Sequence, residues 1–127
     1  IQYANKMTEL LLDATGISSI DGIEKAPSLE ILNLRFNAFV GSLPSQITDL
    51  TNLHTLTMAY NALTGSLPSA IEEMTNLRAL LLSHNEFSGN LHSVNFPSSI
   101  RRLDLSNNEL TGSIPDSFLT LVSFNAE

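Results

Sequence analysis

The segment LTMAYNALTGSLP, from Leu56 to Pro68, repeats much of the earlier segment LNLRFNAFVGSLP, from Leu32 to Pro44. The two segments share Leu, Asn, Ala, Gly, Ser, Leu and Pro in step, so that Leu32 corresponds to Leu56 and Pro44 to Pro68. The residues in between, such as those from Met58 to Tyr60, differ from their counterparts. Self-similarity at a period of roughly 20 to 50 residues indicates a repeat architecture.

The same period runs through the whole chain. Each unit opens on the pattern L-x-x-L-x-L-x-x-N-x-L, with other apolar residues replacing Leu at some places. Five units and a partial sixth follow one another, starting at Met7, Leu29, Leu53, Leu77, Ile100 and Phe124. The unit starts thus recur every ~24 residues, within the range of known repeat architectures. We therefore expect one repeat domain over residues 1–127, which we interpret as a fragment of a longer protein.

The L-x-L step in each unit predicts a short β-strand. Alternation places two apolar side chains on one face of the strand and the residue between them on the other face. A single strand of this kind cannot bury its apolar face, whereas stacked units build a continuous core beneath a parallel sheet. The sequence therefore predicts a solenoid with one strand per turn.

A polar residue follows each strand at the point where the chain must bend. An Asn side chain can both donate to and accept from backbone groups that point inward at such a bend. We expect these residues to form a structural ladder between neighbouring turns, with Thr in place of Asn in the first unit: Thr15, Asn37, Asn61, Asn85 and Asn108.

Gly and Pro mark the return path of each turn. The glycines predict positive φ angles or close approach of a neighbouring turn: Gly41, Gly65, Gly89 and Gly112. Pro44, Pro68 and Pro115 favour an extended segment without an N–H group to satisfy. Apolar residues near and after them should point inward from a short helical or 3₁₀ segment: Leu43, Leu67, Leu91, Ile114, Ile47, Leu50, Ile71, Met74, Phe118 and Leu121.

These units resemble the leucine-rich repeat family over nearly the whole chain. The phrases NALTGSLPSAIEEMTNL and NELTGSIPDSFLTLVSF resemble its 24-residue class with N-x-L-x-G-x-[IL]-P, which is common in plant receptors and occurs in protist surface proteins. The first unit, from Met7 to Ser28, is shorter, lacks the G-x-[IL]-P step and resembles another class. The resemblance implies an α/β solenoid: a right-handed coil with short parallel strands on the concave face and irregular, 3₁₀ or short helical convex segments.

Composition narrows the partner classes. The chain carries 6 Lys and Arg against 13 Asp and Glu, a net charge of −7, which argues against nucleic acid and anionic membranes as partners. No apolar run is long enough for a transmembrane helix, so we expect no direct membrane insertion. The chain contains neither Cys nor an N-x-[ST] acceptor, which fits a reducing compartment but does not exclude a secreted protein.

The variable strand positions, which face away from the core, are the candidate binding surface. All four arginines of the chain fall on these positions, and neither lysine does. Phe36, Tyr60 and His84 occupy equivalent places in successive units, so their rings should stack about 4.8 Å apart. We expect protein or peptide recognition by these residues, because aromatic residues and Arg dominate binding hot spots: Arg35, Phe36, Tyr60, Arg78, His84, Arg101 and Arg102.

Other interpretations of this surface remain. The aromatic column could serve only to stabilise the sheet. The acids Glu9, Asp13 and Glu30 lie toward one end of the face, which predicts an acidic N-terminal end and a basic C-terminal end. The three histidines lie at non-equivalent places, so we expect no metal site, and no motif predicts a cofactor or a catalytic residue.

Three functional hypotheses follow. The first is a non-catalytic protein–protein interaction module that binds a protein or peptide on its concave face. The resemblance implies recognition or adhesion in the extracellular space or at a cell surface, although a cytoplasmic location also fits the composition. The second is the ligand-sensing portion of a receptor or receptor-like kinase, and the third is a structural or assembly scaffold in a larger complex.

Overall fold

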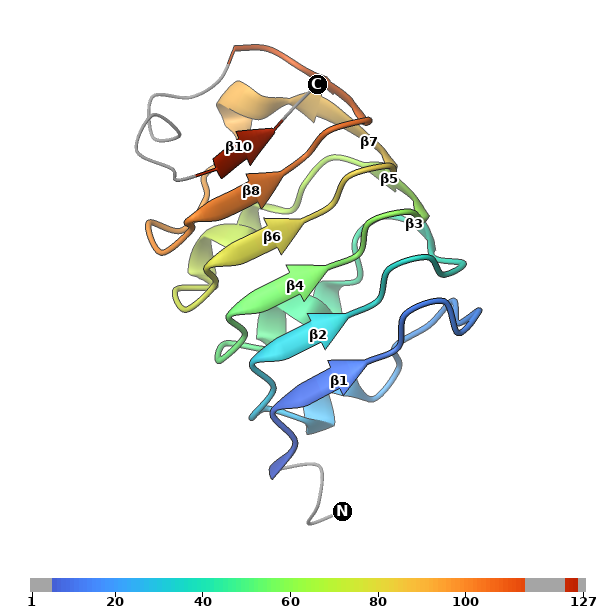
Figure 1. Cartoon of the computed structure of the whole chain (residues 1–127). Coiled ribbons are helices and arrows are strands. Elements are labelled where there is room, and N and C mark those ends of the chain that lie inside the picture. Colours follow the sequence, from blue (N-terminus) through green and yellow to red (C-terminus); the bar gives the residue numbers. More distant parts are fainter. Residues whose placement is uncertain (1–5, 114–122, 126–127) are drawn as a thin grey trace.

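A computed structural model describes residues 6–113 and 123–125 of the chain. Short parallel strands stack one above the other in sequence order, so that each turn contacts the turns before and after it (Figure 1). The strands form a six-stranded sheet in the order β1-β2-β4-β6-β8-β10. Their bounds are Glu9–Leu11 (β1), Ile31–Asn33 (β2), Thr55–Thr57 (β4), Ala79–Leu81 (β6), Arg102–Asp104 (β8) and Ser123–Asn125 (β10).

The register of this sheet follows the repeat period. Ile31 pairs with Thr55, and Thr55 pairs with Ala79, so equivalent residues of successive units lie side by side. The chain thus forms the solenoid that the leucine pattern predicts, and β10 places the start of the sixth unit beside β8.

A second, four-stranded sheet runs along the flank in the order β3-β5-β7-β9. Its strands are Val40–Gly41 (β3), Ala62–Gly65 (β5), Glu86–Asn90 (β7) and Glu109–Thr111 (β9). Gly41 pairs with Leu63 rather than with its sequence equivalent Gly65, so the pairing of β3 with β5 is out of step with the repeat. The sequence did not indicate this second sheet.

The far side of each of the first four turns contains a 3₁₀ helix, as expected for the convex segments. The four helices among the described residues are Ile23–Lys25 (η2), Ser45–Asp49 (η3), Ser69–Glu73 (η4) and Leu91–Ser93 (η5). Pro44 and Pro68 directly precede η3 and η4 in extended conformations. In η5, which lacks this proline, the side chain of Asn90 accepts a hydrogen bond from the His92 N–H instead.

The core lies between the six-stranded sheet and the 3₁₀ helices. The strand leucines of the inner turns, Leu32, Leu56, Leu80 and Leu103, are fully buried. The inward residues of the return path are buried as well: Leu43, Ile47, Leu50, Leu67, Ile71, Met74 and Leu91. Leu10 in the first turn is only half-buried, because no described turn covers that end. The expected inward residues Ile114, Phe118 and Leu121, and the expected extended residue Pro115, lie outside the described residues.

The Asn side chains join neighbouring turns. Asn85 donates through Nδ2 to the carbonyls of Met58 (3.0 Å) and Leu82 (3.1 Å), and its Oδ1 accepts from the Leu63 N–H (3.0 Å). Asn37, Asn61 and Asn108 make the corresponding bonds. Thr15 occupies this place in the first turn, where its N–H and hydroxyl both donate to Asn37 Oδ1.

Gly112 shows why glycine recurs on the return path. Its φ is +88°, in the left-handed region that side chains rarely adopt, and a Cβ there would collide with Asn90 Oδ1. Gly41 has a similar φ of +74° but no neighbouring atom within 4 Å of a Cβ position. No helix in the part of the chain that the structure describes is long and apolar enough to cross a bilayer.

Candidate functional site

The concave face consists of the outward-pointing residues on and around the strands of the six-stranded sheet. Because the strands are parallel and in register, equivalent residues form columns that run along the solenoid. One column contains Glu9, Ile31, Thr55, Ala79 and Arg102. Neighbouring positions of one column therefore lie about 4.8 Å apart, close enough for their side chains to touch.

The three aromatic side chains form a stacked column. The ring centroids of Phe36 and Tyr60 are 4.4 Å apart with planes at 20°, and those of Tyr60 and His84 are 4.1 Å apart at 11°. Asn107 continues the column, since its Nδ2 lies 3.2 Å from His84 Nε2, within hydrogen-bond distance. Phe36 and Tyr60 remain 45% and 40% exposed, so the stack buries only part of its apolar surface.

The backbone of this column differs from the expectation. The rings do not extend from the strands but from the turn beyond each strand end, at one margin of the concave face. Phe36, Tyr60 and His84 have φ values of 53°, 60° and 56°, in the left-handed region that large side chains rarely adopt. Asn107 and Ala14 share this conformation at the same place. The geometry of the turn thus sets the positive φ angle at these positions, and stacking of the rings offsets part of the free-energy cost of this conformation.

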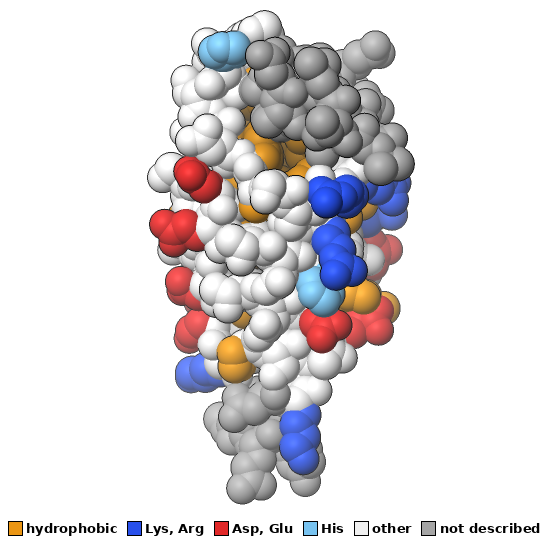
Figure 2. Space-filling view, turned by 90° about the vertical axis from the view of Figure 1, so that its left-hand side faces the viewer, with side chains coloured by type: hydrophobic (Ala, Val, Ile, Leu, Met, Phe, Trp, Pro, Cys, Tyr) orange, Lys and Arg blue, Asp and Glu red, His pale blue; other side chains and the backbone are white. Residues whose placement is uncertain are grey.

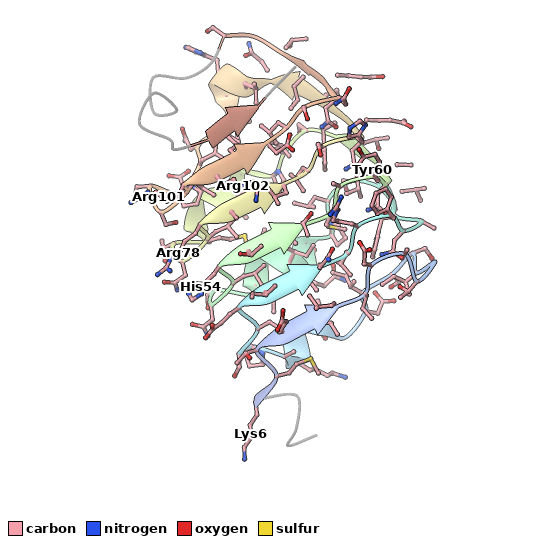
Figure 3. All side chains as sticks on the ribbon, viewed as in Figure 1. Lys6, His54, Tyr60, Arg78, Arg101 and Arg102 are labelled. Carbon is pink, nitrogen blue, oxygen red and sulfur yellow. The ribbon has the colours of Figure 1, made fainter. Side chains whose placement is uncertain are left out.

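The arginines occupy two different places. The guanidinium carbon of Arg35 lies 5.0 Å from the centroid of the Phe36 ring, a cation–π contact at the aromatic margin. Arg78 and Arg101 lie at the opposite margin, where the strands begin, and Arg102 lies on the sheet itself (Figure 3). Arg101 donates to the carbonyls of Ser98 (2.8 Å) and Ile100 (3.0 Å), which holds its guanidinium near the backbone.

The candidate site residues therefore form two groups rather than one cluster. Arg35, Phe36, Tyr60 and His84 line the margin where the strands end, while Arg78 and Arg101 line the margin where they begin (Figure 3). A ligand that touched both groups would have to lie across the whole width of the sheet.

Charge is ordered along the margin where the strands begin. Successive residues there are Glu30, His54, Arg78 and Arg101, joined by backbone hydrogen bonds, and His54 Nδ1 lies 3.7 Å from Glu30 Oε2. Figure 2, which faces the side where the strands begin, shows positive side chains gathered on its right with acidic side chains directly below them, and a separate row of acidic side chains on its left. Nearer the aromatic margin the charges are mixed, because Arg35 lies toward the N-terminal end and Asp104 toward the C-terminal end. The predicted polarity therefore holds for only part of the face.

A hollow of about 210 Å³ lies between the two margins. The residues that line it come from four successive turns: Asn33, Arg35, Thr57, Ala59, Leu81, Ser83, Arg102 and Asp104. Arg35 and Arg102 are candidates from the sequence. Asn33, Thr57 and Ser83 are not among the candidates from the sequence. Their polar character at variable positions is the one signal that could have indicated them.

The described residues contain no assembly suited to metal chemistry. Across residues 6–113 and 123–125, no three His, Asp or Glu side chains gather closely enough to hold a metal ion. What the concave face offers is a broad polar surface with exposed rings at one margin. Such a surface suits recognition of another chain.

Comparison with known proteins identifies the family. A family model described as Leucine rich repeat matches residues 27–87, and a second model of the same description matches residues 99–121. The chain belongs to the leucine-rich repeat family. No curated protein matches the chain at a significant level.

Several solved structures that are similar to this chain are ectodomains of plant receptors. A chain of the BIR3–SERK2 complex from Arabidopsis thaliana is 37% identical over 85% of this chain, with a TM-score of 0.74. A chain of the complex of the Arabidopsis receptor kinase HAESA with the peptide hormone IDA and the co-receptor SERK1 is 31% identical over 87%, at 0.70. A plant ice-binding protein is 27% identical over 96%, at 0.80. The present chain spans 60%, 19% and 41% of these three chains.

Proposed function

We propose that this chain is a non-catalytic protein–protein interaction module that binds a protein or peptide on its concave face. The exposed stack of Phe36, Tyr60 and His84 carries the proposal. Three large side chains stay outside the core on a strained backbone, and Arg35 borders them. Aromatic residues and Arg are the side chains that most often dominate protein interfaces. The resemblance to a receptor complex that contains a peptide hormone supports the same class of ligand.

We also propose that the module works outside the cell or at its surface, as the ligand-sensing portion of a receptor. The support is that several similar structures are receptor ectodomains from plants. Three units, starting at Leu29, Leu53 and Ile100, follow the 24-residue pattern closely enough to propose the plant-receptor class for them. The fourth unit departs from it, with His92 in place of Pro and one residue fewer, and the shorter first unit is proposed as another class. Neither nucleic acid nor a membrane is proposed as a partner, given the net charge of −7.

A second candidate function is a scaffold that assembles through the N-terminal end of the solenoid. An apolar hollow of about 350 Å³ opens there, lined by residues such as Met7, Leu10, Leu12, Ile17 and Ile20. Exposed apolar residues that lie together favour contact with another apolar surface. In that case the concave residues would be dispensable for partner binding.

The experiment is capture of partners from extracts of the source organism with immobilised variants. The test variant combines Phe36→Asn and Tyr60→Asn, since Asn tolerates the left-handed backbone that Asn107 adopts in the same column. The control is Val40→Asn, because Val40 is 72% exposed on β3 and lies off the concave face. A partner retained by the control and lost by the test variant supports the concave site. Equal retention by both would refute it and favour the scaffold.

A further inference from the structure

We propose that the hollow between Arg35 and Arg102 binds an acidic side chain, Asp or Glu, of the ligand. This inference rests on the proposed function and adds the chemistry of one subsite. It concerns the centre of the concave face, between the aromatic column and the margin where the strands begin.

The hydrogen-bonding groups around the hollow are mainly donors. Asn33 Oδ1 already accepts from the Arg35 N–H at 3.1 Å, which leaves the Asn33 amide NH₂ to donate. Asp104 Oδ1 already accepts from the N–H and the hydroxyl of Ser106 at 3.1 and 2.6 Å. The guanidinium groups of Arg35 and Arg102 have no carboxylate partner among the described residues.

Thr57 provides an independent observation. Its side chain lines the hollow, the residue is only 7% exposed, and Oγ1 has no hydrogen-bond partner within the described residues. A buried hydroxyl without a partner destabilises the folded protein, and most buried polar groups avoid this state. Oγ1 has almost no exposed surface of its own, so rotation about χ1 would be needed to turn it toward the hollow, where a ligand oxygen would accept the missing bond.

Charge and size define the ligand group. Two guanidinium groups against one carboxylate, Asp104, leave the lining positive within a chain of net charge −7. Donor-rich positive surroundings favour a carboxylate, which only accepts hydrogen bonds and pairs strongly with Arg. The volume of about 210 Å³ is below the roughly 300–1,000 Å³ of small-molecule sites and suits one side chain of a longer segment.

The test uses two capped peptides, acetyl-Gly-Ser-Glu-Ser-Gly-amide and the same peptide with Gln in place of Glu. Each is titrated into the ¹⁵N-labelled protein at low salt while amide shifts of Thr57, Ala59 and Ser83 are followed. We expect the Glu peptide to shift these amide signals. The Gln peptide should bind at least about tenfold more weakly. Equal shifts from both peptides, or shifts confined to the margins of the face, would overturn the proposal.

Variants separate the subsite from general charge effects. Arg102→Gln should weaken binding of the Glu peptide about tenfold, whereas Lys25→Gln, which removes the same charge from a convex 3₁₀ helix, should leave it unchanged. Thr57→Val should weaken binding of the Glu peptide at least about threefold. The same change should raise the urea midpoint of the free protein by roughly 0.3 M, because it removes a buried hydroxyl that has no partner. The matched change Thr64→Val on β5 should leave peptide binding unchanged.

Two outcomes contradict the subsite. One is Thr57→Val that binds the Glu peptide as the parent does, and the other is equal weakening by Lys25→Gln and Arg102→Gln. Neither outcome bears on partner capture through Phe36 and Tyr60, so failure of the subsite and failure of the proposed function are distinguishable.

Discussion

Replacement of Asn85 by Ala tests the central structural argument, that the Asn ladder holds the turns together. Asn85 is 7% exposed and connects three backbone groups from two turns: the carbonyls of Met58 and Leu82 and the N–H of Leu63. Alanine would leave the Leu63 N–H unpaired, whereas the two carbonyls would each lose one bond and keep a second, from Asn61 and Asn108. A buried N–H left unpaired costs about 1–3 kcal/mol, and each lost carbonyl bond adds about 0.5–1.5 kcal/mol. We expect a loss of about 3–5 kcal/mol in the free energy of unfolding.

The control for this prediction is Asn76→Ala. Asn76 is exposed and donates a single hydrogen bond to the Thr51 carbonyl at 2.8 Å, so its loss should cost about 0.5–1.5 kcal/mol. Urea unfolding followed by circular dichroism measures both variants, and hydrogen exchange of the Leu63 amide reports on the ladder directly. A loss below about 1 kcal/mol for Asn85→Ala, or an unchanged exchange rate at Leu63, would show that the ladder does not hold the turns together.

Three further predictions concern single positions. Tyr60→Asn should be more stable to urea than Tyr60→Ala by about 0.5–1 kcal/mol, because Asn tolerates a φ of 60° better; the opposite order would contradict the backbone argument. Gly112→Ala should cost at least about 2 kcal/mol against about 1 kcal/mol for Gly41→Ala, since only the former meets a neighbouring side chain; thermal melts of the pair decide. Phe87→Ala, at a fully buried position, should cost about 3–5 kcal/mol in chemical denaturation, and a loss near ~1 kcal/mol would mean that the cavity collapses.

Positions that repeat in every turn could be predicted from the sequence. Leu56, Leu80 and Leu103 lie in the core because each turn buries the same face against its neighbours. The stacking of Phe36, Tyr60 and His84 followed from the same logic, since equal places in a parallel sheet lie about one strand spacing apart. The repeat alone therefore determines which side chains are neighbours.

Features that depend on the conformation of a turn, or on how one turn meets the next, could not be predicted from the sequence. Aromatic residues favour strands, so nothing in Phe36 or Tyr60 indicates a left-handed backbone. The positive φ angle comes from the bend that places the following Asn37 or Asn61 in the ladder. The stagger of the flanking sheet is likewise a register between two turns, which the pattern within one repeat does not contain. The missing partner of Thr57 Oγ1 depends on the geometry of two neighbouring turns, which no single repeat contains.

The in-register pairing of successive strands has a consequence for how the molecule can change. Because Ile31 of β2 pairs with Thr55 of β4, and Thr55 with Ala79 of β6, excision of the segment 53–76 would bring β2 directly beside β6 without altering either strand. The concave face can therefore lengthen or shorten only in whole steps of about 4.8 Å, each of which adds or removes one residue from every column. The repeated pattern of leucine and asparagine sets the spacing between turns, whereas the residues that point outward from each turn are free to vary.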